Sequence, residues 1–398
     1  MQAGAAALGG LRVARYRIVL KAREQLLLPP YKGSTMRGAF GRAFRRVSCR
    51  VDCGSDLDLC PSCNQREACP YVYVFETPPP PQSEVLTKYR AVPRPFVIEP
   101  PLDSRTAYQA GEQLSLGLVL IGRAVELLPL FIMAFRDMGA VGIGQRAGRP
   151  QGGRLDVIEV RGVAGEVIRP AGLVRGVVNA DLPTDPELEP VVYSSAAGRL
   201  HDVNVVRTAA DLAREAAALH AQLDALGPGG TPKGGRDAGP GTPKHPRDGG
   251  PALGLRFLTP ARLKYQRDLA TRAEFPILIR NLLRRVSALS YFHCGVRLDM
   301  DFRGFLDRAA SGRILHDETR WLDWERYSNR QETRMALGGL VGRITYTGDL
   351  TQFLPLLVAG AYVHVGKATT FGLGQYVIEV GAPAAAARCR TGSTQAGL

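Results

Sequence analysis

The chain has 398 residues, enough for about two domains, because single hydrophobic cores seldom grow beyond roughly 250 residues. Its 51 lysines and arginines outnumber 37 acidic residues and give a net charge of +14, which indicates a polyanionic partner, nucleic acid above all. No apolar run reaches the ~20 residues that span a bilayer, and no signal peptide is recognisable, so we expect a cytoplasmic protein with no membrane partner.

The first elements are a predicted strand over residues 12–24 and a predicted helix over residues 36–47. Apolar and basic residues alternate in the strand, which predicts one solvated, positively charged face. Ser34 or Thr35 is a suitable N-cap for the helix, whose apolar side chains recur on one face. Its arginines either contact RNA, which the net charge favours, or form only a solvated face. They are Arg37, Arg42, Arg45 and Arg46.

Five of the seven cysteines crowd into residues 49–71, unlike a disulfide framework, which would spread them along the chain. Two residues separate Cys60 from Cys63, a spacing that lets both thiolates reach one ion at tetrahedral geometry. We predict a structural Zn²⁺ that orders an insertion with few apolar residues. The alternatives are an iron–sulfur cluster and unliganded thiols. The predicted ligands are Cys60, Cys63, Cys69 and either Cys49 or Cys53.

Three short motifs occur twice in the same order, which indicates an internal duplication. Each copy reads as strand, helix, strands, helix, glycine-rich loop and strand. This order predicts an α+β fold of tandem ferredoxin-like (RRM-like) domains, with the cysteine-rich metal-binding insertion in the first. The repeats are Arg-Arg-Val-Ser at 45–48 and 284–287, Leu-Pro-Leu at 128–130 and 354–356, and Val-Ile-Glu-Val at 157–160 and 377–380.

Between the two copies, an alanine-rich helix is predicted over residues 209–226. The glycine- and proline-rich stretch 227–250 has almost nothing to bury, so we expect it to be disordered. In the second copy, Trp321 and Trp324 stand among basic and polar residues. This mixture is typical of RNA contact surfaces where bases stack, although tryptophan more commonly packs in a core.

The stretch from residue 362 to residue 380 is the strongest candidate for a site. Glycines let a backbone approach a ligand closely, and such a loop can direct several N–H groups at a phosphate. The alternative is a tight helix-to-strand connection whose glycines only solve backbone geometry. The predicted RNA-binding residues in the second copy are Lys264, Gly366, Lys367, Gly372 and Gly374.

Histidine is the natural proton carrier near neutral pH, and His364 lies beside these glycines. The alternative for His364 is a histidine at a strand end that is satisfied by a backbone carbonyl. We expect His293, at the end of a predicted helix, to be packed and not catalytic. Tyr31 and Lys32, in the loop before the first helix, are the next candidates for catalysis.

Several motifs in this order resemble the CRISPR-associated RAMP superfamily, and within it the Cas6 family of repeat-RNA-processing endoribonucleases with a C-terminal glycine-rich loop. The resemblance covers most of the chain from about residue 12 to residue 380. Its most specific piece is the glycine-loop motif. The motifs are MRGAFGRAFRRVSC (36–49), CPYVYVFE (69–76), FLTPARLK (257–264), DWERYSNRQ (323–331) and HVGKATTFGLGQY (364–376).

The resemblance implies ferredoxin-like domains over residues 11–195 and 253–382, joined by a helix and linker over 196–252. It favours Cys49 over Cys53 as the fourth metal ligand. It also implies metal-independent cleavage of CRISPR precursor RNA within its repeats, in which a 2′-hydroxyl attacks its own phosphodiester and leaves a 2′,3′-cyclic phosphate. The partners it implies are CRISPR repeat RNA or crRNA and the subunits of a CRISPR effector complex.

The chain departs from the family pattern at the histidine that relatives often carry in or beside the first helix. No histidine precedes His201, and Arg42 stands where relatives can carry one. The sequence therefore leaves open a non-catalytic RAMP subunit that binds crRNA in an effector complex. Composition and duplication alone would also support a zinc-bearing RNA-binding protein outside CRISPR.

Overall fold

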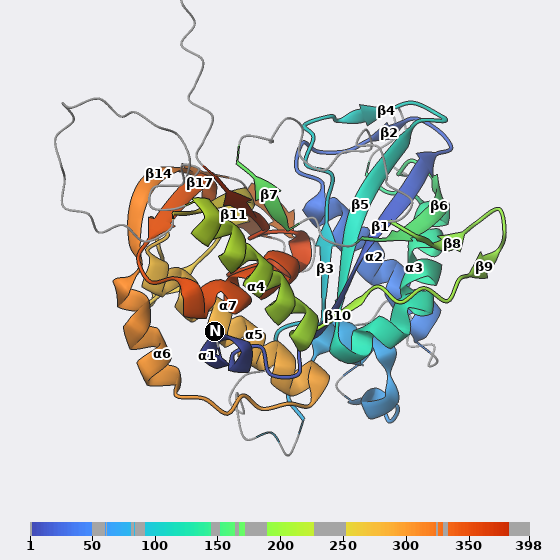
Figure 1. The fold of residues 1–398 in the computed structure, drawn as a ribbon. Helices are drawn as coiled ribbons and strands as arrows, with labels where there is room; N and C mark the ends of the chain where they lie inside the picture. The colour runs from blue at the N-terminus through green and yellow to red at the C-terminus, as the bar shows by residue number, and fades with distance from the viewer. Residues whose placement is uncertain are drawn as a thin grey trace, which may run out of the picture.

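The computed structural model describes residues 2–49, 60, 62–80, 83, 92–144, 152–163, 167–171, 189–226, 252–323, 325–328 and 333–381. Cys53, Trp324 and the predicted linker 227–250 lie outside these residues. Two groups of strands and helices stand side by side (Figure 1). We call residues 12–208, from β1 to β10, the first half, and residues 253–380, from β11 to β18, the second half. The fold is mixed α+β with antiparallel sheets, as predicted.

The sheet of the first half is built around β1, which is antiparallel to both of its long neighbours. Alternate apolar residues of β1 pack with phenylalanines of α2 (Gly33–Ser48) and α3 (Leu128–Val141) in one buried cluster. A short strand, β10 (Val206–Thr208), also pairs with β1. The strand order is β3 (Phe96–Glu99), β5 (Gln113–Ile121), β1 (Arg12–Ala22), β6 (Leu155–Gly162), β8 (Val191–Ser194) and β9 (Arg199–Leu200).

The other face of β1 is not the solvated positive face that the sequence predicted. Arg15 and Arg17 are each 7% exposed. The Nε of Arg15 donates to Glu99 over 2.9 Å, and the Nε of Arg17 donates to Glu189 over 3.0 Å. The prediction was wrong at the centre of the strand because buried carboxylates, which lie far away in the sequence, neutralise these arginines.

The sheet of the second half is antiparallel except at one edge, where β7 (Ile168–Pro170) of the first half pairs parallel with β18. The halves therefore share a sheet. Helices α5 (Phe275–Cys294) and α7 (Leu354–Val363) contact one another, and α4 (Ala209–Leu226) lies against α7. The strand order is β14 (Arg313–Leu322), β17 (Gly339–Thr347), β11 (Leu253–Ala261), β18 (Tyr376–Val380) and β7.

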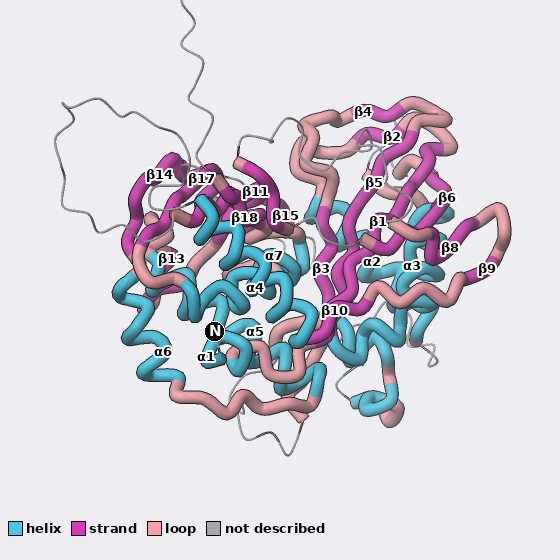
Figure 2. Tube along the Cα trace, in the orientation of Figure 1, coloured by secondary structure: helices cyan, strands magenta, loops and turns pink. Residues whose placement is uncertain are grey.

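Both halves repeat one chain order and one strand order. When only the long helices and the strands of the two main sheets are counted, each half begins with a strand, a helix, two strands, a helix and a strand. The sheet then places these strands in the order second, third, first, fourth: β3, β5, β1, β6 in the first half and β14, β17, β11, β18 in the second. The repeated motifs of the sequence thus coincide with repeated topology, which Figure 2 shows as two sheets with helices packed against them.

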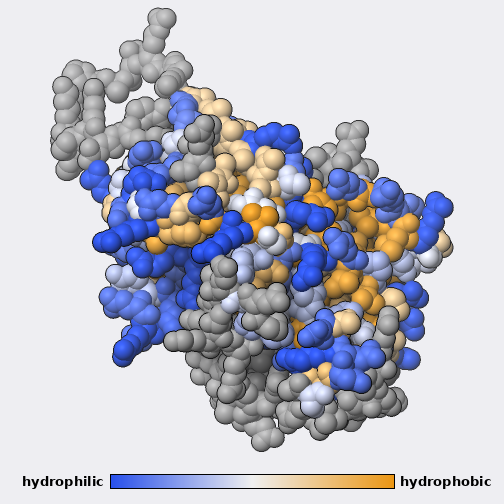
Figure 3. All heavy atoms as spheres, turned by 90° about the horizontal axis from the view of Figure 1, so that it is seen from below, coloured by the Kyte–Doolittle hydropathy of each residue, from blue (hydrophilic) through white to orange (hydrophobic). Residues whose placement is uncertain are grey.

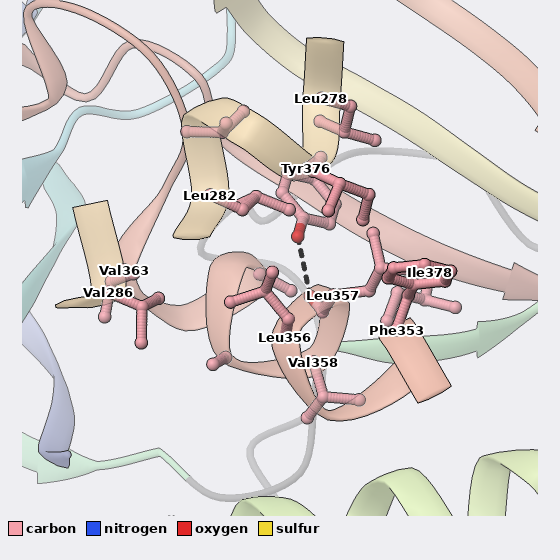
Figure 4. Close-up of a cluster of buried hydrophobic side chains, with 14 of the residues drawn as sticks. Leu278, Leu282, Val286, Phe353, Leu356, Leu357, Val358, Val363, Tyr376 and Ile378 are labelled. Atoms are coloured by element: carbon pink, nitrogen blue, oxygen red, sulfur yellow. Dashed lines mark hydrogen bonds between the residues drawn. The ribbon is translucent and has the colours of Figure 1, made fainter. Parts of the chain in front are cut away.

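The core of the second half is centred on α7, in which every residue is buried (Figure 4). The hydroxyl of Tyr376 donates to the carbonyl of Leu357 over 2.6 Å. Gly360 is required there, since a Cβ at this position would lie 2.3 Å from the Tyr376 hydroxyl oxygen. Each fully buried leucine in this cluster contributes roughly 1.5–3 kcal/mol of transfer free energy.

Shorter helices and strands complete the fold. Within the described residues, no helix is long and apolar enough to cross a membrane. Seen from below, hydrophilic side chains and apolar patches are interspersed over the surface (Figure 3). The short helices are α1 (Gln2–Ala6), η2 (Arg66–Ala68), η3 (Val72–Glu76), η4 (Gly122–Leu127), α6 (Phe302–Arg308), η6 (Ala309–Ser311), η7 (Thr351–Phe353) and η8 (Thr369–Phe371). The short strands are β2 (Leu26–Leu27), β4 (Ala107–Tyr108), β12 (Lys264–Tyr265), β13 (Asp268–Leu269), β15 (Glu325–Ser328) and β16 (Thr333–Ala336).

Candidate nucleic-acid interface

Residues 364–375, which we call the glycine loop, connect α7 to β18. The loop enters the left-handed region of φ at two residues that are not glycine, His364 (φ 64°) and Ala368 (φ 61°). Such residues cost of order 1–3 kcal/mol each and persist only where the surroundings fix them. Contacts with neighbouring residues therefore maintain the conformation of the loop.

Several amides of the glycine loop are already bonded to protein carbonyls. Gly372 donates to Thr369 over 2.8 Å, Gly374 donates to Pro260 over 3.0 Å, and Lys367 donates to Arg262 over 3.0 Å. The expectation that Gly372 and Gly374 present free N–H groups to a phosphate is thus not met in this structure. Glycine at position 374 instead allows the backbone to pack closely, since a Cβ there would lie 1.8 Å from the Val365 oxygen.

The glycine loop packs against the first half through Phe371. The hydroxyl of Tyr31 donates to the Phe371 carbonyl over 2.7 Å, and burial raises the pKa of Tyr31, so the hydroxyl keeps its proton. The guanidinium carbon of Arg37 lies 5.0 Å from the ring centroid of Phe75 and 5.1 Å from that of Phe371. Tyr31 and Arg37, which the sequence assigned to catalysis and RNA binding, thus join α2 and the segment before it to the glycine loop.

Lys32 is fully buried, with 0% exposure. Its Nζ donates to the backbone oxygen of Asp103 over 2.7 Å and to Oδ1 of the same residue over 3.0 Å. A buried ammonium that is paired in this way is held by the fold. In this conformation Lys32 does not face solvent, where an RNA phosphate would lie.

His364 is also fully buried. Its Nε2 lies 2.9 Å from Oε1 of Glu99, and its Nδ1 lies 3.2 Å from the Leu373 carbonyl oxygen. Burial alone would raise the pKa of Glu99, but the charge of Arg15 and the hydrogen bond from His364 outweigh it and lower that pKa to about 2. Both nitrogens of His364 therefore face protein acceptors. Glu99, which the sequence analysis did not single out, links the first half to the glycine loop.

The exposed side of the glycine loop belongs to a group of cations that we call the basic cluster: Arg262, Lys264, Arg284 and Lys367. Burial lowers the pKa of the Lys367 ammonium, and the charges of the other three lower it further. Lys264 is held against α5 by the side chain of Asn281, which accepts from the Lys264 amide over 3.0 Å and donates to its carbonyl over 3.0 Å. The structure thus brings together Lys264 and Lys367, which the sequence predicted to bind RNA.

Arg262 adds a second feature to the basic cluster. Within the part of the chain that the structure describes, its Nε is buried and has no hydrogen-bond acceptor. Burial also lowers the pKa of this guanidinium. Arg262 and Arg284 were not predicted as RNA contacts, although both lie in motifs that the sequence had marked, FLTPARLK and the repeated Arg-Arg-Val-Ser. Crowded cations that include a buried guanidinium nitrogen without an acceptor among the described residues are a candidate site for an anion.

The arginines of α2 are divided between internal contacts and solvent. The Nε of Arg46 donates to Asp137 over 2.9 Å, and the guanidinium of Arg45 lies 5.9 Å from the ring centroid of Tyr71. Arg42 is exposed. Of the four predicted RNA-binding arginines, Arg42 is the one that the fold leaves most open to a partner.

The described cysteines of the insertion only partly converge. Cys49, Cys63 and Cys69 line one cavity of about 240 Å³, whereas Cys60 does not line it. Among the described residues, no group of three or more His, Cys, Asp or Glu side chains is arranged to hold a metal ion. The donor chemistry fits Zn²⁺, since thiolates are its preferred ligands in structural sites. The zinc site remains a prediction.

Two other predicted residues have clear places. His293 is packed, as expected: its Nε2 lies 2.7 Å from the Pro93 oxygen, its Nδ1 lies 3.2 Å from the Tyr73 hydroxyl, and burial lowers its pKa to about 4. Trp321 is 38% exposed at the edge strand β14, where its indole nitrogen donates to Asp323 over 2.7 Å. Trp321 is therefore not a core residue.

The chain is similar to two protein-family models. Residues 11–175 match a model described as an N-terminal domain, and residues 255–376 match the model of the CRISPR-associated endoribonuclease Cas6. The second match contains Arg262, Lys264, Arg284 and Lys367. A comparison with curated protein sequences finds no match.

Solved structures offer distant likenesses. A partial Cas6-RT-Cas1–Cas2 complex aligns with 93% of this chain at 12% identity and a TM-score of 0.48, and this chain spans 46% of that one. A Cas6 product complex aligns with 92% at 14% identity and a TM-score of 0.42, over 99% of its own length. Cas6 from Thermus thermophilus aligns with 92% at 12% identity and a TM-score of 0.44, over 98% of its length. The match over residues 255–376 agrees with the resemblance that the motifs predicted: this region of the chain is similar to the Cas6 family of CRISPR-associated endoribonucleases.

Proposed function

We propose that this protein binds CRISPR repeat RNA and takes part in the processing of CRISPR precursor RNA. The observation that carries the proposal is the basic cluster, which lies at the glycine loop inside the region that matches the Cas6 family. Cations that repel one another are neutralised when a phosphate binds among them. A net charge of +14 also supports a polyanionic partner. We place this RNA-processing role in the cytoplasm.

The proposed reaction is a metal-independent cleavage within the repeat. The 2′-hydroxyl oxygen bonds to the adjacent phosphorus, the bond from phosphorus to the 5′-oxygen breaks, and the products are a 2′,3′-cyclic phosphate and a 5′-hydroxyl. One group must accept the 2′-hydroxyl proton and another must protonate the leaving oxygen. Lys264 and Lys367 would stabilise the charge that develops on the phosphate, because preorganised cations act most strongly where charge builds up.

A non-catalytic subunit that binds crRNA in a CRISPR effector complex is the second candidate. The observation that favours it is that the three predicted catalytic residues, His364, Tyr31 and Lys32, all contact protein acceptors. No histidine lies in or before α2. Association with further CRISPR proteins is part of this proposal.

We also propose the architecture and the metal that the sequence predicted. The strand order shared by the two halves supports ferredoxin-like domains over residues 11–195 and 253–382, with 196–252 between them. Three thiols on one cavity support a zinc-bearing insertion over residues 49–71, with Cys49, Cys60, Cys63 and Cys69 as ligands. In this proposal the zinc is structural and takes no part in cleavage.

The deciding experiment incubates the purified protein with end-labelled repeat RNA from the CRISPR array nearest its gene, in EDTA. We expect cleavage at one position, with a cyclic phosphate on the 5′ fragment. Tight, repeat-selective binding without cleavage would favour the non-catalytic subunit. Equal affinity for the repeat and for a shuffled RNA of the same length would contradict both and support an RNA-binding protein outside CRISPR.

A further inference from the structure

Both ends of the glycine loop converge on one carboxylate oxygen. His364, the first residue of the loop, places its Nε2 2.9 Å from Oε1 of Glu99. Gln375, the last residue of the loop, donates its Nε2 to the same oxygen over 3.2 Å. Glu99 lies on β3 of the first half, whereas the loop belongs to the second half. A single side chain of one half therefore binds both ends of the loop of the other.

The second oxygen of Glu99 anchors the carboxylate in its own sheet. Arg15 on β1 donates its Nε to Oε2 over 2.9 Å, and Glu99 is 4% exposed. Gly117 on β5 makes room for this arrangement, since a Cβ there would lie 2.1 Å from Oε2. Three hydrogen-bond donors thus hold the two carboxylate oxygens in the space that Gly117 leaves. A carboxylate that is bonded in this way has little freedom to rotate.

The position of the loop sets the position of Lys367 in the basic cluster and bears on its neighbour Arg262. Lys367 belongs to the loop, and its amide donates to the carbonyl of Arg262, another member of the cluster. The strained φ angles of His364 and Ala368 mean that the loop conformation has to be imposed by its neighbours. At the ends of the loop, Glu99 of the first half does so together with Thr259 of the second half, whose hydroxyl oxygen accepts from the Gln375 amide over 2.9 Å.

We propose that Glu99 is a positioning residue: it clamps both ends of the glycine loop to the first sheet, and so fixes Lys367 and its neighbours in the basic cluster relative to the exposed Arg42 on α2. An RNA that contacts both surfaces needs this spacing, because phosphates along one strand lie at set distances. The part of the proposal that concerns RNA rests on the proposed function. The part that concerns the loop does not.

The first test measures hydrogen exchange of the RNA-free protein. In Glu99→Ala, we expect the amides of Val365, Lys367 and Gly374 to exchange about 10- to 100-fold faster, since a lost charged hydrogen-bond acceptor exposes them by local opening. The matched control is Glu189→Ala. Glu189 is equally buried, and it pairs with Arg17 on the same face of β1, two residues from Arg15. This control should leave the three loop amides unchanged.

A conservative variant separates positioning from general stability. In Glu99→Gln the amide oxygen can still accept from His364 and Gln375, so we expect most of the loop protection to return, even though the ion pair with Arg15 is lost. Equal exchange rates in Glu99→Ala and in the parent would overturn the proposal. So would equal loosening of the loop in Glu99→Ala and Glu189→Ala.

The second test measures affinity for the labelled repeat RNA over a range of salt concentrations. For Glu99→Ala, we expect a weaker affinity and a shallower salt dependence, because fewer phosphates are held at once. For Glu189→Ala, both should match the parent. If the loop exchanges faster but RNA binding is unchanged, the proposed effect on RNA binding is wrong, while the role of Glu99 in holding the loop stands. A parent that binds no RNA would refute the proposed function, while the exchange test still decides the role of Glu99.

Discussion

The guanidinium carbon of Arg37 lies over the rings of both Phe75 and Phe371, at 5.0 and 5.1 Å from their centroids. Phe75 follows the cysteine-rich insertion, and Phe371 belongs to the glycine loop. An arginine on α2 thus joins the segment that follows the insertion to the glycine loop. Cation–π contacts of this kind contribute about 0.5–2 kcal/mol each, the larger values where solvent is excluded.

Gly374→Ala should destabilise the protein more than Gly198→Ala. Both glycines have a positive φ, 72° and 65°, so both variants carry the cost of a left-handed alanine, about 1–2 kcal/mol. An added Cβ at Gly198 meets nothing within 4 Å, whereas at Gly374 it would lie 1.8 Å from the Val365 oxygen. We expect a further loss of roughly 1–3 kcal/mol at Gly374, measured by urea unfolding. Equal losses would show that the loop adapts readily.

Stability should fall as the pH drops from about 6.5 toward 4, because of His293. Its ordinary pKa of 6.5 is lowered to about 4 in the fold, chiefly by burial. The unfolded chain therefore binds a proton in this range that the folded chain does not, and the full contribution, on the order of 3 kcal/mol, is present only above pH 6.5. His293→Gln should flatten the dependence of Tm on pH between 6.5 and 4. An unchanged slope would assign the effect to other groups.

His364→Ala tests the residue that the sequence put forward as the proton carrier. A catalytic role predicts cleavage slowed by ~10²-fold with RNA affinity nearly intact. The contacts with Glu99 and Leu373 lead us to expect otherwise: a lower Tm, faster exchange of the loop amides and weaker RNA binding. Single-turnover cleavage and affinity, measured on the same folded preparation, distinguish the two. A selective loss of cleavage would restore His364 as the proton carrier.

Metal analysis tests the zinc prediction. We expect about one Zn²⁺ per chain, lost in the double variant Cys60→Ser, Cys63→Ser together with a fall in Tm, because metal binding to a small insertion is also folding free energy. Cys294→Ser is a suitable control, since Cys294 lies at the end of α5 and outside the insertion. A metal-free parent, or a double variant as stable as the parent, would contradict the prediction.

The sequence predicted the elements well wherever local pattern decides them. The helix over 209–226 has the bounds that its alanine-rich periodicity indicated, and the repeated Leu-Pro-Leu motif begins a helix in both halves. The Arg-Arg-Val-Ser motif ends α2 but lies in the middle of α5. His293 is packed, as expected. These features follow from the periodicity and composition of neighbouring residues, and both can be read from a single sequence.

What the sequence could not predict depends on pairs that are far apart in the chain. Arg15 looked solvated because nothing near it in the sequence is acidic, yet Glu99 neutralises it in the fold. The glycines of the loop looked suited to a phosphate, but tertiary contacts decide where their N–H groups point, and Gly374 binds the Pro260 carbonyl. Lys264 and Lys367 were found from charge and motif, and only the fold shows that they share a cluster with Arg262.

The most direct test of the account is the salt dependence of repeat-RNA binding by the parent and by Lys264→Ala and Lys367→Ala. Each lysine that contacts a phosphate should contribute about one unit to the slope of log affinity against log salt, so each variant should lose about that much. Lys21→Ala, an exposed lysine at the end of β1, is the control and should keep the parental slope. The account predicts steep salt dependence that both cluster variants reduce and the control does not. Identical slopes in all four proteins would contradict it.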